Sequence, residues 1–541
     1  MTFQTRLTPT MAQKYRIAGL WTDETLCEVL AKRAAATPDR EALFDGTNRL
    51  SYRDLAHGVD RMAARLRSLG VNAGDIVTVQ IPNWIEFAYV FFALERLGAV
   101  AIPVSVDFRS REVDYIMRFA ASTVFICCDK FRDFDHVAMF ESIKAGIPGV
   151  KLVANIRGPA RPGVVNLDDT VRAKGPPANF QPAPANVDAI MRMAFTSGTT
   201  GNPKGVTHNH NTTLAAARIL NGDQNLGEDE VMLIYLPLGL NWGYLTLVQA
   251  IFSGARAVLL DRFRASTALE LIQQERVTYV PTAPASITAM LNDPKLSSYD
   301  LSSLRLVITG GASAPIETIR AYRRHMQGTL LELYGMLETG YHTYTRKSDD
   351  PEKVTGSCGK LASHMGLRIV DDQFRDLPQG ATGEILCDGP SVHLGYHNSP
   401  SANAELFTPD GWFRTGDLGL IDESGNLRIV GRLKEIINRG GKKFFPREIE
   451  EILYQHPKVM YCALVGVPDP RLGERNHLFV VPKGEAPSLD ELVAYLGDSV
   501  ATYKLPEQLE IVPELPFTPT GKIQRHVLVK QLLERESKSK P

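Results

Sequence analysis

The sequence predicts an α/β protein in which helices cover mostly parallel sheets. Apolar residues switch repeatedly between helical and strand spacing along the chain, which is the pattern of alternating helices and strands. Several strand-length runs, such as 257–260 and 304–308, are almost wholly apolar, as is typical of parallel strands buried on both faces. The length of 541 residues allows several domain-sized units around a large apolar core.

The N-terminal part shows this alternation in order. Ser51 supplies a helix-capping hydroxyl, and the helix that it opens stops at Gly70. A strand at 76–81, a helix at 87–97 and a strand at 100–104 follow. We therefore expect sheets with helices packed on their faces.

The C-terminal part reads as a separate, smaller unit. The proline-rich segment 158–186 predicts only a surface excursion, whereas a sharper boundary lies near Gly431. Beyond it, Pro446 opens a helix, a strand is expected at 459–467, and Ser488 begins a capping box for another helix. We expect a large domain over 1–430, a hinge at 431–434 and a small α+β domain over 435–541.

Charge and cysteine content exclude some classes of function. Lys and Arg number 60 against 61 Asp and Glu, so no global field attracts nucleic acid or an anionic membrane. The six cysteines are scattered and form no C-x-x-C pair, which fits a reducing compartment, and we expect a cytoplasmic protein. The most apolar stretch, 84–106, contains charged residues and a proline, so we expect no transmembrane segment. The N-terminus has no apolar core typical of a secretory signal.

A glycine- and hydroxyl-rich loop follows the apolar run 190–195 and predicts a phosphate site. Its glycines allow close backbone approach, its hydroxyls donate hydrogen bonds and its lysine supplies a cation. Pro203 breaks the Walker A spacing, which disfavours a P-loop NTPase, and a plain surface turn would need neither the lysine nor the hydroxyls. The candidate residues are Thr196, Ser197, Gly198, Thr199, Thr200, Gly201 and Lys204.

This loop resembles the phosphate loop of the adenylate-forming superfamily, which includes acyl-CoA synthetases, adenylation domains and luciferases. Further segments are similar to family signatures and occur in the family's order: Tyr334-Gly-Met-Leu-Glu338, Gly411-Trp-Phe-Arg-Thr-Gly-Asp417, Gly431-Arg-Leu-Lys434 with Pro446-Arg-Glu-Ile-Glu450, and Pro519-Thr-Gly-Lys522. The resemblance covers nearly the whole chain. It implies a small β-barrel-like subdomain within the large domain, and a mobile small domain that carries the adenylation lysine.

The resemblance also implies a reaction and its catalytic residues. When ATP activates a carboxylate, two anions approach each other at the α-phosphorus, so cations must screen them. Lys204 would hold the leaving phosphates, Glu338 would be the Mg²⁺ ligand, and Lys522 would contact the acid oxygen and the α-phosphate. Taken alone, Glu338 could equally be a solvated residue and Lys522 an exposed tail lysine.

The implied nucleotide site extends beyond the phosphate loop. Tyr334 would lie along the adenine, and Asp417 would accept the ribose hydroxyls with Arg432 beside it. Core filling by Tyr334 and a plain turn at Asp417 are the alternatives. The remaining residues assigned to ATP or AMP are Gly310, Gly311, Ala312, Gly335, Met336 and Leu337.

The acid pocket, the hinge and the CoA site are likewise implied by resemblance. Lys434 would be the hinge residue. Leu337 and Leu240 depart from the family pattern, which often has a hydroxyl residue at the first position and a histidine or aromatic residue at the second. The acid-pocket set is Leu240, Asn241, Trp242, Gly243, Gly311 and Gly335, and the CoA set is Arg439, Gly440, Gly441 and Lys442. Simple solvated charge is the alternative at Lys442.

Three functions remain open at this point. The first is an AMP-forming acid:CoA ligase that uses ATP, Mg²⁺ and CoA on a medium-chain or cyclic or aromatic acid. The second is an aryl-acid adenylating enzyme that loads a carrier protein, and local resemblance to dihydroxybenzoate-AMP ligases at Asn241 favours it. The third is a nucleotide-binding relative without synthetase activity, suggested by Leu337 and Leu240. The oligomeric state, including a homodimer, stays open.

Overall fold

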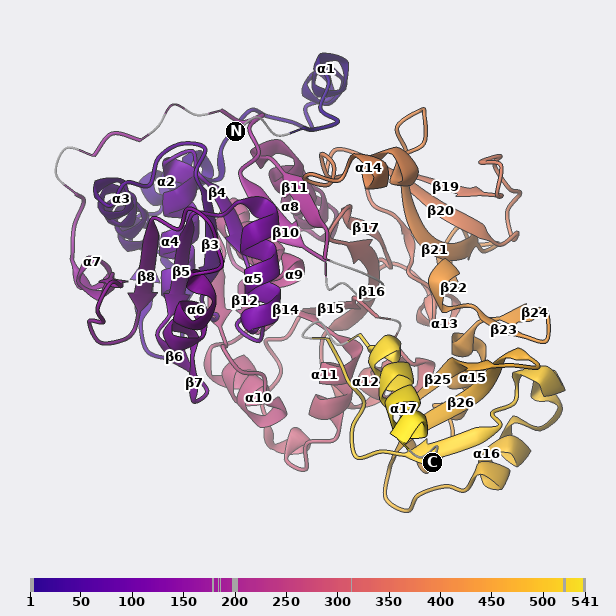
Figure 1. Cartoon of the computed structure of the whole chain (residues 1–541). Coiled ribbons are helices and arrows are strands. Elements are labelled where there is room, and N and C mark those ends of the chain that lie inside the picture. The colour runs from indigo at the N-terminus through magenta and orange to yellow at the C-terminus, as the bar shows by residue number, and fades with distance from the viewer. Residues whose placement is uncertain are drawn as a thin grey trace.

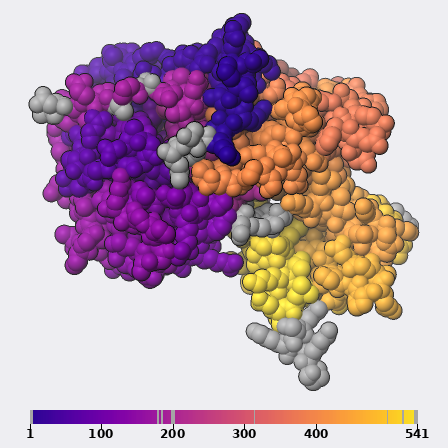
Figure 2. Space-filling model, turned by 45° about the horizontal axis from the view of Figure 1, so that its top comes forward, coloured from indigo at the N-terminus to yellow at the C-terminus, as the bar shows by residue number. Residues whose placement is uncertain are grey.

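The computed structural model describes residues 4–177, 180–182, 184, 186–196, 203–312, 314–518 and 522–538. They form a large body and a smaller C-terminal lobe, which stands out in yellow and orange (Figures 1 and 2). The chain therefore has the predicted α/β class, with a large N-terminal part and a small C-terminal part. Among the described helices, we find none with the length and apolar character needed to cross a bilayer.

The first sheet of the large body is parallel from β1 to β16, and antiparallel strands extend it at both ends. Its order is β18 (Lys360–Leu361), β17 (Gly340–Tyr344), β16 (Thr329–Met336), β15 (Leu306–Gly310), β14 (Tyr279–Thr282), β12 (Val231–Ile234), β13 (Arg256–Leu259), β1 (Glu41–Phe44) and β2 (Arg49–Ser51). The strand expected at 304–308 is thus β15, displaced by two residues to match the register of β14 and β16.

The second sheet is parallel except at β11, which pairs with β10 in the antiparallel sense. Its order is β11 (Gly205–His208), β10 (Arg192–Phe195), β4 (Val100–Pro103), β3 (Ile76–Gln80), β5 (Val124–Cys128), β8 (Leu152–Ile156) and β9 (Val165–Asn166). The segment 158–186 is more than a surface excursion, because it contains β9 and the short helix α7 (Asp168–Arg172). All six cysteines are free, and Cys127 and Cys128 are buried in β5.

A layer of helices lies between the two sheets and contains much of the apolar core. These helices are α2 (Leu26–Ala36), α3 (Tyr52–Ser68), α4 (Ile85–Arg96), α8 (His210–Gln224) and α9 (Asn241–Ser253). Helix α4 packs on β3 and β4, α9 packs on β12 and β13, and α2 contacts both helices. The predicted cap is confirmed, because the Ser51 hydroxyl accepts a hydrogen bond from the Asp54 N–H at 3.1 Å.

Other helices cover the outer faces or lie at the periphery (Figure 1). They are α1 (Pro9–Ile17), α5 (Ser110–Ala120), α6 (His136–Lys144), α10 (Ala265–Gln274), α11 (Pro284–Leu291), α12 (Ile316–His325), α13 (Pro351–Val354) and α14 (Pro400–Leu406). Strands β6 (Lys130–Phe131) and β7 (Phe134–Asp135) form a small separate ribbon.

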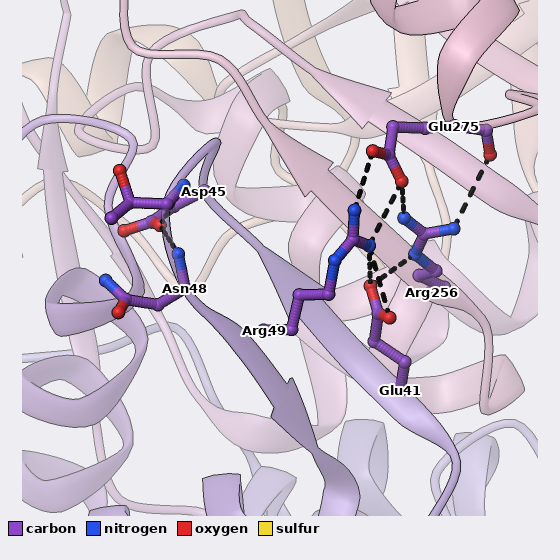
Figure 3. Close-up of polar contacts among 7 residues, drawn as sticks. Glu41, Asp45, Asn48, Arg49, Arg256 and Glu275 are labelled. Atoms are coloured by element: carbon purple, nitrogen blue, oxygen red, sulfur yellow. Dashed lines mark hydrogen bonds and ion pairs between the residues drawn. The ribbon is translucent and has the colours of Figure 1, made fainter.

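The N-terminal hairpin is tied to the edge of the first sheet by charged side chains. Arg256 on β13 lies with its Nε 2.6 Å from a Glu41 carboxylate oxygen, and it also pairs with Glu275 just after α10. Arg49 on β2 reaches both carboxylates, at 2.9 Å from Glu41 and 2.8 Å from Glu275 (Figure 3). The four side chains therefore alternate in sign and hold three distant segments together.

The expected barrel-like subdomain is an antiparallel sheet whose pairing path is open. It consists of β19 (Gly366–Val370), β20 (Gly383–Asp388), β21 (Phe413–Ile421) and β22 (Leu427–Arg432). The 3-10 turn Leu433–Glu435 leads from β22 into the C-terminal lobe, so it overlaps the hinge expected at 431–434.

The C-terminal lobe is a mixed sheet with helices, and it has its own apolar clusters. Its strands are β23 (Ile437–Arg439), β24 (Lys442–Phe444), β25 (Val459–Asp469), β26 (Gly473–Pro482) and β27 (Gln508–Ile511), and its helices are α15 (Pro446–Leu453), α16 (Leu489–Leu496) and α17 (Arg525–Lys538). Pro446 opens α15, and the Ser488 hydroxyl caps α16 by accepting from the Glu491 N–H, both as predicted.

Candidate active site

A cavity of about 1180 Å³ lies where the first sheet, the antiparallel sheet of β19–β22 and the C-terminal lobe meet. The carboxyl ends of parallel strands are the usual position for a ligand site in such sheets. Residues far apart in the sequence line it together: Thr196, Lys204, Asn241, Glu338, Asp417, Arg432, Lys434 and Lys522. The motifs singled out in the sequence therefore converge on one space.

Asp417 contacts Tyr334 and Arg432 at one side of this cavity, and these three residues are here called the Asp417 wall. Arg432 lies directly opposite it on β22, with Nε 2.8 Å from one carboxylate oxygen. The Tyr334 hydroxyl donates to the other oxygen at 2.8 Å. The Asp417 side chain is only 5% exposed, and its charge raises the pKa of Arg432. This wall holds an oriented acceptor of the kind that a pair of ribose hydroxyls requires.

A second cavity of about 250 Å³ adjoins this wall. Gly311, Ala312, Tyr334 and Gly335 line it, together with Asp417. These small residues beside an aromatic ring make a slot suited to a flat base. Gly310 lines neither cavity. It faces the neighbouring strand β16, where an added Cβ would lie 2.6 Å from the Leu333 carbonyl oxygen.

Glu338 follows β16 and is fixed by two hydrogen bonds. The Tyr396 hydroxyl donates to its Oε1 at 3.0 Å, and its backbone carbonyl accepts from the His393 N–H at 2.7 Å. Burial raises the pKa of the Glu338 carboxyl. Lys204 lies on the ring face of the same tyrosine, with Nζ 5.1 Å from the ring centroid. Tyr396 thus links the two residues, a role that the sequence did not indicate.

The carboxylate of Glu338 fits the demands of Mg²⁺, a cation that is often held by one or two carboxylates and by substrate phosphates. Among the other described residues, the Tyr396 hydroxyl donates a hydrogen bond to this carboxylate. Within the described ranges no group of three or more His, Cys, Asp or Glu side chains is arranged to hold a metal. A Mg²⁺ ion here would therefore depend on phosphate oxygens as well as on Glu338.

Lys522 enters the cavity from the C-terminal lobe. Its backbone N–H donates to the Thr518 hydroxyl at 3.0 Å. Burial, followed by the positive charge of Arg432, lowers the pKa of the Lys522 ammonium to about 8, while Asp417 and Glu338 act in the opposite direction. The ammonium makes no hydrogen bond or ion pair with a described residue. It is a desolvated cation near Asp417 and Arg432.

Most of the residues expected to form an acid pocket line the same cavity. Leu240, Asn241, Trp242, Gly311 and Gly335 all line it. Gly243 does not, because it faces the backbone before α9, where a Cβ would lie 2.2 Å from the Leu236 carbonyl oxygen. Met336 and Leu337 also line the cavity, and the Leu337 carbonyl oxygen lies 3.0 Å from Nε2 of His208.

The residues expected to bind CoA are not brought to the cavity. Gly440 and Gly441 form the turn between β23 and β24, where both have positive φ angles. Arg439 pairs with Glu507 at 2.8 Å, and Lys442 lies 4.9 Å from the centre of the Tyr503 ring. Ser197, Gly198, Thr199, Thr200 and Gly201 fall outside the described residues, as do Pro519, Thr520 and Gly521.

Comparison with known proteins agrees with this arrangement. Residues 30–397 match the model of the AMP-binding enzyme family, and residues 448–522 match that of the AMP-binding enzyme C-terminal domain. The chain is 33% identical to the medium-chain fatty-acid–CoA ligase of Escherichia coli (strain K12), over 96% of this chain and 93% of the relative. It is 32% identical to the 2,3-dihydroxybenzoate-AMP ligase of Bacillus subtilis (strain 168), over 97% of each.

A solved structure extends the likeness to three dimensions. The anthranilate CoA ligase AuaEII, in complex with anthranoyl-AMP, superimposes with a TM-score of 0.88 at 26% identity, over 96% of this chain and 98% of that one. The similarity therefore spans both the large body and the C-terminal lobe.

Proposed function

The chain belongs to the AMP-binding, adenylate-forming enzymes, and from this premise we propose that it is an AMP-forming acid:CoA ligase. The observation that carries the proposal is the convergence of Lys522 with Glu338 and the Asp417 wall in one cavity. This convergence brings cations and an oriented acceptor to the place where two anions must react. We infer ATP, a carboxylic acid and CoA as the substrates.

In the first step, an acid oxygen attacks the α-phosphorus of ATP and the bond to the β-phosphate breaks, so pyrophosphate leaves. The Lys522 ammonium stabilises the negative charge on the acid and the α-phosphate. Lys204 holds the departing phosphates, and the Asp417 carboxylate holds the ribose. Glu338 would bind a Mg²⁺ ion, which supplies charge neutralisation at the phosphates.

In the second step, a thiol sulfur attacks the acyl carbon, the thiol proton passes to solvent, and AMP leaves with the bonding electrons. We propose that the C-terminal lobe rotates at Lys434 between the steps and brings the turn at Arg439–Lys442 toward CoA. The exposed glycine turn and its basic residues support this assignment.

The acid is proposed to be compact and mainly apolar, either medium-chain or cyclic or aromatic. Leu240, Trp242 and Leu333 give the cavity an apolar wall, and Tyr341 adds an aromatic ring. The alternative, adenylation of an aryl acid for a carrier protein, is supported by the relative that acts as a 2,3-dihydroxybenzoate-AMP ligase.

Release of AMP and pyrophosphate, measured with a panel of carboxylates with and without CoA, tests the proposal. The panel includes linear acids, cyclohexanecarboxylate and hydroxybenzoates, and Lys522→Ala serves as the inactive control. Acid-dependent AMP release that requires CoA supports the ligase. Adenylate formation with no response to CoA favours carrier loading, and ATP binding without turnover of any acid indicates a relative without synthetase activity.

A further inference from the structure

An arginine is buried behind the acid pocket without a carboxylate partner. Arg192 begins β10 and is only 1% exposed. Its Cζ lies 4.1 Å from the centre of the Tyr244 ring, and its Nε makes no hydrogen bond with a described residue. Burial lowers the pKa of the Arg192 guanidinium to about 10, so it is still charged at neutral pH. No carboxylate of the described chain lies within ion-pair distance of it.

A buried, uncompensated charge is costly to the fold, so stability alone does not account for this residue. Among the described residues, Arg192 makes one side-chain hydrogen bond, from Nη2 to the amide oxygen of Asn241 at 2.7 Å. Asn241 is the first residue of α9 and lines the main cavity. The guanidinium is therefore linked to the acid pocket through this one amide.

This contact decides which end of the Asn241 amide is available. A guanidinium carries only donors, so the amide oxygen must face it and the amide NH₂ must face elsewhere. The Asn241 Nδ2 makes no hydrogen bond with a described residue, and its neighbours Leu240 and Trp242 give the cavity an apolar wall. The adjacent charge also polarises the amide, which strengthens it as a donor.

We propose that Arg192 is a positioning residue for acid choice: it fixes the Asn241 amide so that the pocket favours an acid with an oxygen acceptor, such as a hydroxyl or carbonyl, on its ring or chain. An amino group at the same position would set donor against donor, and an unsubstituted acid would leave the amide unpaired. This inference rests on the proposed function, because it concerns the acid of that reaction.

The first test reverses the polarity of the pocket. Asn241→Asp is nearly isosteric, gains Arg192 as a counter-ion, and presents an acceptor where the wild type presents a donor. Pyrophosphate exchange is measured with benzoate and with its hydroxy and amino derivatives at each ring position. In the wild type, we expect one hydroxy isomer to exceed benzoate and its amino counterpart in kcat/KM. The hydroxy-to-amino ratio should fall by about tenfold or more in Asn241→Asp, the scale of one exchanged hydrogen bond.

The second test removes the positioning group. In Arg192→Met, the KM of the preferred hydroxy acid should rise several-fold relative to that of benzoate, and Arg192→Lys should recover part of the difference. The thermal unfolding midpoint of each variant distinguishes a loss of stability from a change in acid preference. A purely structural role predicts a lower midpoint and an equal loss with every acid, and that result would overturn the proposal.

Calorimetric titration of the acids in the presence of AMP keeps the two proposals distinguishable. If acids bind with no hydroxy preference, or with a preference that neither Arg192→Met nor Asn241→Asp changes, then Arg192 has no role in acid choice. If the preference is present in binding but no acid supports exchange, then the inference holds and the proposed ligase activity fails.

Discussion

The two sides of the cavity are built in opposite ways. On the side of the large body, Asp417 accepts a hydrogen bond from Tyr334 and forms an ion pair with Arg432, so its charge is paired and its oxygens are oriented. On the side of the C-terminal lobe, the Lys522 ammonium is buried and donates no hydrogen bond to a described residue. The first side is organised before any ligand arrives, whereas the second is completed only by an anion. We therefore expect the first to govern nucleotide binding and the second to govern the reaction.

Removing the lysine should have the largest effect on the reaction. Lys522→Ala should slow adenylate formation by about 100- to 1000-fold, the effect of losing one preorganised donor to a developing charge. Thiolysis of preformed acyl-adenylate should change far less, because the lysine faces the first step. Single-turnover measurements of each half-reaction check this. Equal losses in both would show that Lys522 serves the whole cycle.

Removing the carboxylate should instead weaken ATP binding. Asp417→Ala deletes an acceptor and leaves Arg432 unpaired, so ATP affinity by calorimetry should fall by about 10- to 100-fold. Tyr334→Phe is the matched control, because it removes one donor to Asp417 but keeps the ring, and it should cost only a few-fold. An Asp417→Ala protein with unchanged ATP affinity would place the ribose elsewhere.

The pH dependence of adenylation should report the lysine. Because its pKa is lowered to about 8, Lys522 is charged below that pH and loses its charge as the pH rises through it. The kcat/KM for adenylation should therefore fall by about tenfold per pH unit above 8. In Lys522→Arg the cation persists, so this alkaline decline should disappear. A decline at the same pH in the arginine variant would assign it to another group.

An ion-paired cluster outside the cavity serves as a control for the substitutions in the site. Arg256 joins Glu41 and Glu275 at the sheet edge, with no part in the site (Figure 3). Arg256→Met should lower the free energy of unfolding by about 1–2 kcal/mol, because two partly buried carboxylates lose a partner. ATP affinity should not change. A loss of ATP affinity comparable to that of Asp417→Ala would mean that paired charge anywhere supports the site.

Local signals in the sequence predicted elements well where one segment decides the structure. The caps at Ser51 and Ser488 and the helix start at Pro446 depend on neighbouring residues only, and each is confirmed. Strand β9 escaped prediction because it is two residues long and is defined by pairing with β8. Its proline-rich surroundings gave no strand pattern.

The same distinction applies to the candidate site. Glu338, Asp417 and Lys522 were identified from motifs, and they lie around one cavity. Tyr396 and Arg192 were not identified, because they contact Glu338 and Asn241, which are distant from them in sequence. Gly243 illustrates the reverse case. It was assigned to the acid pocket by resemblance, but helix geometry turns it toward the backbone before α9.

The pairing of the β1–β2 hairpin with β13 also has a consequence during synthesis. Leu43 on β1 pairs with Ala257 on β13, so the N-terminal hairpin emerges from the ribosome long before its partner strand exists. Until then its open edge is a template for wrong pairing. Chains arrested before β13 should therefore aggregate or recruit chaperones, whereas chains that extend past the end of β13 at Leu259 can pair this edge.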